Sequence, residues 1–204
     1  MIAIIDYGLG NIKAFANVYK QLNIQAMVVN HPEQLAKADK IILPGVGSFD
    51  YAMQRLIDSG MVETLNDMVL KKSIPVLGIC VGMQMLAISS QEGNLPGLGW
   101  IDATVKRFDS STFNHPACIP HMGWNDVMPT GTTRLMQNLG QNARFYFLHS
   151  YYFNSNREEN IIATTDYGIQ FTSAIGFNNI FGVQFHPEKS HQWGVQLLKN
   201  YSKI

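Results

Sequence analysis

The chain has 204 residues, and its 15 basic and 15 acidic side chains give a formal net charge of zero. This length suits a single domain spanning residues 1–204, and the hydrophobic content of 46% is that of a globular protein. The balanced charge argues against nucleic acid or a membrane surface as a partner, and no apolar run approaches the ~20 residues that span a bilayer. Only two cysteines and a start without a basic region predict a cytoplasmic protein without a signal peptide.

The first half of the chain alternates short apolar runs with helical patterns. Helices are predicted at 11–22, at 32–38, between residue 45 and about residue 71, and from about residue 81 onward. Strands are predicted at 2–6, 24–29, 40–45 and 74–79. These strand segments lack polar alternation, which is typical of a parallel sheet covered by helices on both faces.

Beyond residue 100 the predicted strands follow one another through turns. They cover 103–108, 144–153, 160–165, 170–177 and 180–185, and an amphipathic helix at 191–201 closes the chain. No linker separates the two halves. The sequence therefore predicts one α/β domain whose second half is rich in strands.

Cys80 lies in a G-x-C-x-G pattern, between the predicted strand 74–79 and the helix that follows it. The flanking Gly78 and Gly82 would let the backbone turn sharply and let neighbouring elements approach. This is the context of a nucleophile elbow, in which unpaired N–H groups of a helix N-terminus favour the thiolate. A buried structural cysteine is the competing interpretation.

A nucleophilic cysteine needs a base, and the base needs an orienting group. His186 is the candidate base, because it ends the apolar strand, Pro187 stops that strand, and Glu188 is close enough to orient the imidazole. The carboxyl ends of parallel strands meet at one edge of a sheet, so we expect Cys80 and His186 to lie together there.

The other histidines have simpler interpretations. His31 precedes a proline at a helix start and is expected at the surface, His191 begins the last helix, and His149 is expected to be packed and hydrogen-bonded within an aromatic strand. The segment from His115 to His121 has an H-x2-C-x2-H spacing, but it contains two prolines and has no fourth ligand nearby. No metal and no cofactor is therefore predicted.

Two glycine-rich turns follow predicted strands, at 8–11 and at 43–49. Backbone N–H groups in such a turn can point at a developing oxyanion. Binding of a phosphate or a dinucleotide is the competing interpretation, but neither turn completes G-x-G-x-x-G or carries G-K-[ST].

With these pieces in place, the chain resembles the class I, triad-type glutamine amidotransferases. The segments that correspond to that family's oxyanion strand, nucleophile elbow and His-Pro-Glu segment are "PGVGSFD", "GICVGMQML" and "GVQFHPEKS", in the family's order. Further segments resemble the glutaminase subunits of imidazole glycerol phosphate synthases: "IIDYGLGNIKAF", "HMGWN", "FLHSYYF" and "LLKN". The resemblance implies an α/β, flavodoxin-like three-layer fold with a mixed central sheet.

The resemblance also implies a role for individual residues in the hydrolysis of L-glutamine. Cys80 matches the nucleophile, His186 the base and acid, and Glu188 the orienting group. The other matched positions are Gly45, Val46, Gly47 and Val81 for the oxyanion, Gln84, Glu92, Ser150 and Tyr151 for substrate, and Trp124, Asn125 and Lys189 for the face that meets a synthase subunit.

The identity of the ammonia acceptor is a separate question. The resemblance implies a heterodimer with a cyclase subunit of histidine biosynthesis, because the glutaminase domain uses the whole chain. Val81 after the cysteine, "AISSQEG" and "GLGWID" depart from that pattern and keep open a related branch that feeds a surface-polysaccharide sugar amidotransferase. A flavodoxin-like nucleotide-binding module and a catalytically silent regulatory subunit also stay open, but neither explains Cys80 together with His186 and Glu188.

Overall fold

The computed structural model describes residues 1–140 and 142–204. The strands are β1 (Ile2–Ile5), β2 (Ala26–Val29), β3 (Lys40–Gly45), β4 (Val76–Cys80), β5 (Ser89–Ser90), β6 (Ala103–Arg107), β7 (His121–Asp126), β8 (Met128–Pro129), β9 (Arg144–His149), β10 (Tyr151–Ser155), β11 (Ile161–Asp166), β12 (Gln170–Phe177) and β13 (Ile180–Val183). The helices are α1 (Ile12–Gln21), α2 (Phe49–Asp58), α3 (Val62–Asn66), α4 (Val81–Gln84) and α5 (His191–Tyr201), with short helical turns η1 (Pro32–Lys37), η2 (Asp67–Lys71), η3 (Ser110–Thr112), η4 (Glu158–Asn160) and η5 (Pro187–Lys189).

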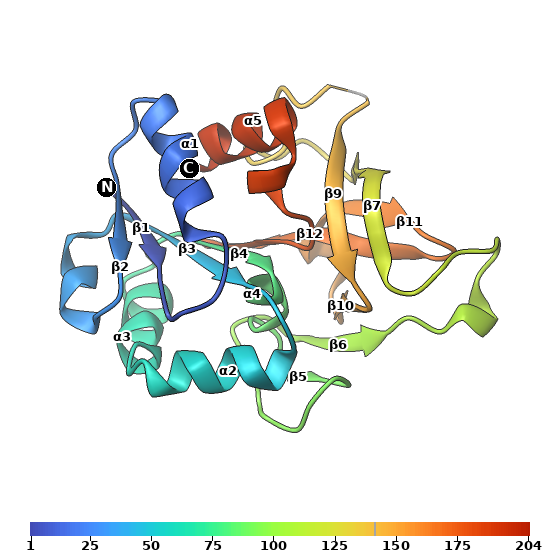
Figure 1. The fold of residues 1–204 in the computed structure, drawn as a ribbon, viewed down its shortest axis with the longest axis horizontal. Helices are drawn as coiled ribbons and strands as arrows, with labels where there is room; N and C mark the ends of the chain where they lie inside the picture. Colours follow the sequence, from blue (N-terminus) through green and yellow to red (C-terminus); the bar gives the residue numbers. More distant parts are fainter. Residues whose placement is uncertain (141) are drawn as a thin grey trace.

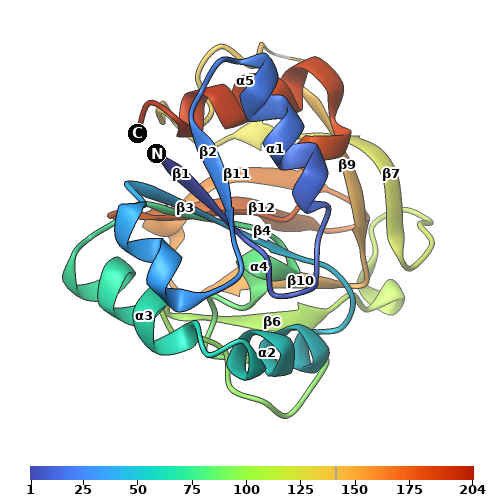
Figure 2. The same ribbon diagram turned by 60° about the vertical axis from the view of Figure 1, so that its left-hand side comes forward.

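The central sheet is mixed, and its strand order is β2-β1-β3-β4-β13-β12-β10-β6-β5. Strands β2, β1, β3, β4 and β13 run parallel, whereas β12 is antiparallel to β13. Helices α1 and α5 lie together over one face of the sheet, and α2 and α3 lie over the other (Figure 1 and Figure 2). The predicted three-layer α/β fold with a mixed central sheet is confirmed.

The helices are held to the sheet by large side chains that the sheet buries. Phe15 and Tyr19 form the buried face of α1, as the helical spacing predicts. From α5, the hydroxyl oxygen of Tyr201 lies 2.6 Å from the carbonyl oxygen of Ile41 and 2.8 Å from that of Pro75, near the starts of β3 and β4. Its one proton can be donated to either oxygen. This buried contact fixes the C-terminal helix against the starts of the central strands β3 and β4.

The structure differs from the sequence prediction mainly between residues 120 and 155. The predicted strand 144–153 is two strands: β9 pairs with β7 in a separate two-stranded sheet, and β10 joins the central sheet. The chain bends at Ser150 between them. Strand β7 was not predicted, because Gly123 and two polar residues at its end weaken the local strand signal and its pairing with β9 supplies the stability.

Smaller differences concern the ends of elements. The helix expected at 32–38 is the 3-10 turn η1, and the helix expected from residue 81 is only the four-residue α4. Strand β2 begins at Ala26 rather than at residue 24. Within residues 1–140 and 142–204, no helix combines the length and the apolar character that crossing a membrane requires.

Candidate active site

Cys80 is the last residue of β4, and α4 begins at the next residue. Its backbone has φ 56° and ψ −113°, in a region that side-chain-bearing residues rarely adopt. Such strain persists only where the surroundings enforce it, and it clusters at functional sites. The sharp strand-to-helix turn is the geometry of a nucleophile elbow, in agreement with the prediction from the G-x-C-x-G pattern.

The flanking glycines are needed because backbone packs directly on backbone here. A Cβ at Gly82 would lie 1.9 Å from the carbonyl oxygen of Leu43 in β3, and one at Gly78 would lie 2.6 Å from the carbonyl oxygen of Gly82. A Cβ at Gly45 would lie 2.3 Å from the amide nitrogen of Gly82. The three glycines thus let α4 sit against the ends of β3 and β4, which places Cys80 beside the turn that follows β3.

His186 and Glu188 lie just beyond β13, the strand that neighbours β4. The Nδ1 atom of His186 is 3.0 Å from Oε1 of Glu188, and their side chains are 5% and 2% exposed. The backbone of His186 is fixed by its N–H, which donates to the carbonyl of Tyr146 in β9 (2.8 Å). Because a carboxylate only accepts, Nδ1 of His186 carries the proton of this hydrogen bond.

The charge of His186 depends on its two buried neighbours. Burial acts to lower the pKa of the imidazole, but the nearby Cys80 sulfur and the Glu188 carboxylate outweigh it, so that the pKa of His186 is raised above its ordinary value. In the described part of the chain the second oxygen of Glu188, Oε2, is buried without a hydrogen-bond partner. The sequence-predicted Cys80, His186 and Glu188 are therefore brought together as thiol, imidazole and carboxylate.

A cavity of about 490 Å³ opens at this triad. Its walls include residues at the carboxyl ends of β3 and β4, residues of strand β9 and a residue of the turn η5. The lining residues are Val46, Gly47, Cys80, Val81, Glu92, Pro120, Leu148, His149, Ser150, His186 and Lys189. The cavity is therefore a cleft with a buried thiol and imidazole at its floor.

The predicted oxyanion residues lie at one end of this cavity. Gly45 pairs in register with Cys80, and Val46, Gly47 and Val81 line the wall. Gly47 has φ 87°, which glycine adopts readily. The hydroxyl of Tyr7 donates to the carbonyl of Pro44 (2.6 Å) and so ties the first glycine-rich turn, 8–11, to the second.

The four predicted substrate residues do not all face the cavity. Glu92 and Ser150 line it, and Oε2 of Glu92 accepts from the backbone N–H of Phe49 (2.8 Å), while burial raises the pKa of Glu92. Gln84 and Tyr151 lie behind the wall. The Nε2 of Gln84 donates to the Tyr151 carbonyl at 3.0 Å, and the Gln84 side chain is buried rather than on a helix surface.

The predicted partner-facing residues differ in their exposure and in their contacts. Trp124 on β7 is 36% exposed and stacks on His191, whereas Asn125 is half-buried and donates to Nε2 of His121 (3.2 Å). Lys189 lines the cavity, with Nζ 5.6 Å from the centre of the Tyr146 ring. The exposed apolar surface continues onto a cross-strand pair, and its members are Met122 (64% exposed) and Leu148 (40% exposed).

Sequence reasoning missed several residues of the site. Pro120 and Leu148 line the cavity, and His149, predicted only as a packed histidine, is both hydrogen-bonded and part of the lining. Gln184, a polar residue within an apolar strand pattern, lies beside Cys80, and its polarity in that context was the available signal. The zinc-like spacing does not form a site: His121 pairs with His149, His115 pairs with Asp166, and Cys118 is exposed.

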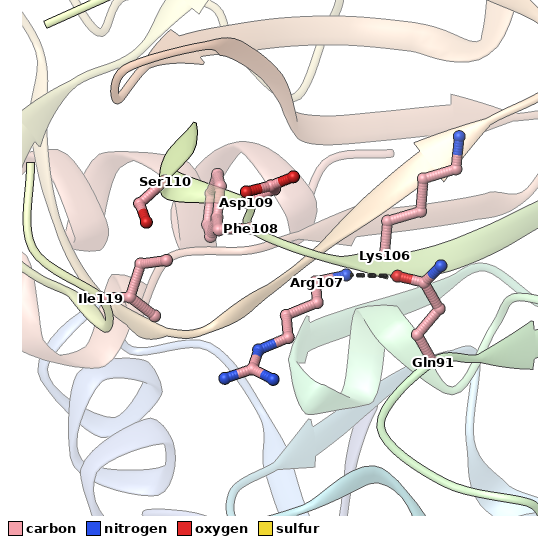
Figure 3. A pocket seen from close by; sticks show the side chains of 7 residues that line it. All are labelled: Gln91, Lys106, Arg107, Phe108, Asp109, Ser110 and Ile119. Atoms are coloured by element: carbon pink, nitrogen blue, oxygen red, sulfur yellow. Dashed lines mark hydrogen bonds between the residues drawn. The ribbon is translucent and has the colours of Figure 1, made fainter. Parts of the chain in front are cut away.

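A second cavity, of about 540 Å³, lies along β6 (Figure 3). Its two cationic residues, Lys106 and Arg107, are consecutive in the strand and point in different directions in Figure 3. The backbone N–H of Arg107 donates to Gln91 (2.8 Å), and the Asp109 carboxylate accepts from Ser111. The charged side chains of this cavity do not converge on a common point. The cavity at Cys80 is therefore the better candidate for an active site.

Comparisons with known proteins assign the class of this fold and site. A model of the family described as "Glutamine amidotransferase class-I" matches residues 3–202. The chain belongs to the class I glutamine amidotransferase family. Among solved structures, one titled "Crystal structure of glutamine amidotransferase" has a TM-score of 0.73 at 19% identity, covering 100% of this chain and 99% of that one.

Relatives with a higher sequence identity to this chain belong to one branch of this family. The chain is 54% identical to the "Imidazole glycerol phosphate synthase subunit HisH" of Bdellovibrio bacteriovorus and 52% identical to the subunit of the same name from Leptospira interrogans. Each alignment covers 100% of both chains. A "HisH 2" subunit from Methanococcus maripaludis is 48% identical over 100% of this chain and 99% of its own length.

Proposed function

We propose that the chain is the glutaminase subunit of an imidazole glycerol phosphate synthase, hydrolysing L-glutamine to glutamate and ammonia in histidine biosynthesis. The observation that carries the proposal is the buried Cys80–His186–Glu188 arrangement at a cavity, in a chain that aligns over its full length with HisH subunits at up to 54% identity. Its two cysteines are both unpaired, which fits a reducing compartment such as the cytoplasm.

The first half-reaction forms a covalent intermediate. The thiolate of Cys80 attacks the side-chain amide carbon of glutamine, and the carbonyl oxygen takes up the negative charge. Val46, Gly47 and Val81 line the cavity, and their backbone N–H groups are the donors that we assign to that oxyanion. His186, whose raised pKa keeps it protonated at neutral pH, gives its proton to the nitrogen as the C–N bond breaks, and ammonia leaves.

The second half-reaction releases glutamate from the thioester. The imidazole of His186, now neutral, takes a proton from water, and the resulting hydroxide attacks the thioester carbon. The C–S bond then breaks, which returns Cys80 as the thiolate and His186 as the imidazolium. Glu188 holds Nδ1 of the ring throughout, so that the other nitrogen stays directed at the reacting atoms.

The cavity also supplies groups for the amino-acid end of glutamine. Glu92 is a carboxylate in the lining and can accept hydrogen bonds from the α-ammonium group, as the family resemblance implies. Ser150 follows the end of β9, two residues after Leu148, and contributes polar atoms to the same cavity lining. Gln84 and Tyr151 support this wall from behind through their mutual hydrogen bond.

Ammonia made here needs an acceptor site on another subunit. Lys189 and Leu148 line the cavity, Met122 pairs with Leu148 across the strands, and Trp124 lies on the same strand as Met122. Such a part-exposed aromatic and aliphatic surface is typical of the core of a protein interface. We place the cyclase subunit of the synthase on this face, forming a heterodimer that receives the ammonia without its release to solvent.

The partner is tested by titration while glutamate release is followed. Binding of the cyclase, with its nucleotide ligand, should turn one backbone N–H of the turn at Val46 and Gly47 toward the oxyanion. This should raise the glutaminase rate by about 10²–10³-fold, because the lack of a single oxyanion donor costs a factor of this size. Trp124→Ala should weaken the complex by about 30-fold in Kd if Trp124 is an interface anchor. Leu70→Ala, at an exposed apolar side chain of η2, is the matched control and should leave the affinity unchanged.

Two results would contradict the proposal. Full activity of the chain without any partner would remove the need for a synthase subunit. Stimulation by a surface-polysaccharide sugar amidotransferase, with none by the cyclase, would assign the chain to the related branch that Val81 and the segment at 87–93 left open.

A further inference from the structure

Gln184 has a buried polar side chain beside the site, and the mechanism above gives it no role. It follows β13, two residues before His186, and it is fully buried. Its Nε2 lies 3.9 Å from Sγ of Cys80, and its Oε1 lies 3.1 Å from Nε2 of Gln84. Burying an amide is costly unless its donors and acceptor are satisfied, so these contacts need an explanation.

The orientation of the Gln184 amide follows from its neighbours. The Tyr151 carbonyl can only accept, so the atom of Gln84 that faces it at 3.0 Å is the NH₂ group. The same NH₂ group faces Gln184 and therefore meets the acceptor, Oε1. This leaves the NH₂ group of Gln184 directed at Cys80.

The chain of hydrogen bonds is anchored on its far side as well. The Tyr151 carbonyl also accepts from Nδ1 of His149 (2.8 Å), and Nε2 of His149 meets Nδ1 of His121 (3.0 Å). The backbone N–H of Gln184 is used separately, because it donates to the carbonyl of Ser173 (2.9 Å). Both the backbone and the side chain of Gln184 are thus fixed before any substrate binds.

We propose that Gln184 is a positioning residue for the Cys80 sulfur: its amide N–H, oriented by Gln84, donates to the sulfur and stabilises the thiolate relative to the thiol. The donor contributes little to a neutral thiol, since S–H sulfur is a weak acceptor, and more to an anionic sulfur. This inference deepens the proposed function, because attack on glutamine needs the thiolate.

The direct test is the pH dependence of Cys80 alkylation. Iodoacetamide reacts with the thiolate, which displaces iodide and forms a thioether, so the rate against pH reports the thiolate fraction. All variants carry Cys118→Ser, which removes the exposed second thiol. In Gln184→Met, which keeps the length of the side chain and loses the N–H, the midpoint should rise by about one pH unit.

Two further variants separate the hydrogen bond from packing. Gln184→Glu keeps an acceptor for Gln84 but faces the sulfur with a carboxylate, so its midpoint should rise further than that of Gln184→Met. Ser173→Ala is the matched control, because Ser173 is buried next to Gln184 and its hydroxyl has no partner in the described part of the chain. Its midpoint should not move.

Glutamine turnover supplies an independent measurement. In the complex with its synthase, Gln184→Met should lower kcat by about tenfold and leave KM unchanged, since the donor acts on the sulfur and not on glutamine. Folding of each variant is checked by thermal unfolding, and Gln84→Met, which frees the Gln184 amide, replaces Gln184→Met if that variant does not fold.

The results distinguish this inference from the proposed function. An unchanged alkylation midpoint in folded Gln184→Met, or an equal shift in Ser173→Ala, would overturn the role of Gln184. A shifted midpoint in a protein that hydrolyses no glutamine with any synthase would instead overturn the proposed function, because alkylation of Cys80 does not depend on glutamine.

Discussion

Alanine at Gly82 tests whether the contact between α4 and β3 sets the geometry of the site. The added Cβ would lie 1.9 Å from the carbonyl oxygen of Leu43, 3.0 Å from its carbonyl carbon and 3.2 Å from that of Pro44. A non-bonded carbon normally keeps about 3.5 Å from such atoms, so α4 and β3 have to separate by more than about 1 Å. The atoms in the way are backbone atoms of a central strand, which cannot swing aside as a flexible side chain can.

Two opposing effects decide the stability of Gly82→Ala. Helix propensity alone favours alanine by about 1 kcal/mol. Overpacking a closely packed site costs about 1–3 kcal/mol, and here it involves backbone on both sides. Because backbone is in the way, the upper part of this range, about 2–3 kcal/mol, applies. The expected net loss of stability is about 1–2 kcal/mol, a decrease of about 2–8 °C in Tm for a chain of this size.

The effect on activity should be larger than the effect on stability. Leu43 and Pro44 lead directly into the oxyanion turn, and Val81 precedes Gly82 on the other wall of the cavity. A displacement of about 1 Å in a reacting geometry can cost a factor of about 10², so kcat for glutamine hydrolysis in the synthase complex should fall by about that factor.

Gly131→Ala is the matched control for this experiment. A Cβ at Gly131 meets nothing within 4 Å, and its φ is not in the left-handed region, so the same chemical change should leave Tm and kcat near their wild-type values. Glutamate release and thermal unfolding of both variants are the measurements. A Gly82→Ala protein with wild-type Tm and kcat within twofold of wild type would refute the packing argument.

Other variants and conditions give distinct expectations. His186→Ala should abolish turnover, whereas Glu188→Gln should leave residual activity, because an orienting group matters less than the group that transfers the proton; equal losses in initial-rate assays would contradict these roles. Burial lowers the pKa of His149 to about 3 and that of His121 to about 4, below the value of about 6.5 that histidines have in the unfolded chain. The unfolded state therefore binds more protons as the pH falls from about 6.5 toward 4, and the free energy of unfolding should decrease over that window. Urea unfolding measures it, and His149→Gln should reduce the slope; an identical slope in wild type and variant would count against the buried neutral pair.

The features that could be predicted from the sequence are those that depend on neighbouring residues in the chain. The parallel strands β1, β3 and β4 are continuous apolar runs, and the elbow at Cys80 is a contiguous motif, so both follow from neighbouring residues. The pairing of Cys80 with His186 followed from a rule about strand ends, and in the structure β13 lies beside β4.

Features that depend on pairing in space were not predictable in this way. The predicted strand 144–153 is divided at Ser150 because β9 pairs with β7. The sequence of β7 itself carries only a weak strand pattern, so this pairing could not be predicted. Gln84 was matched to substrate from its position in the motif, yet its amide is engaged by Tyr151 and Gln184, residues 67 and 100 positions away. No pattern along the chain brings those three residues together.

Covalent labelling of the thiols is the most direct test of the central claim that Cys80 is the nucleophile of a glutaminase. A glutamine analogue with an electrophilic side chain is incubated with the complex, and intact mass and peptide mapping give the number and position of adducts. We expect a single adduct at Cys80 that excess L-glutamine prevents, and neither adduct nor turnover in Cys80→Ala. An adduct at Cys118, together with unchanged glutamine hydrolysis in Cys80→Ala, would contradict the account.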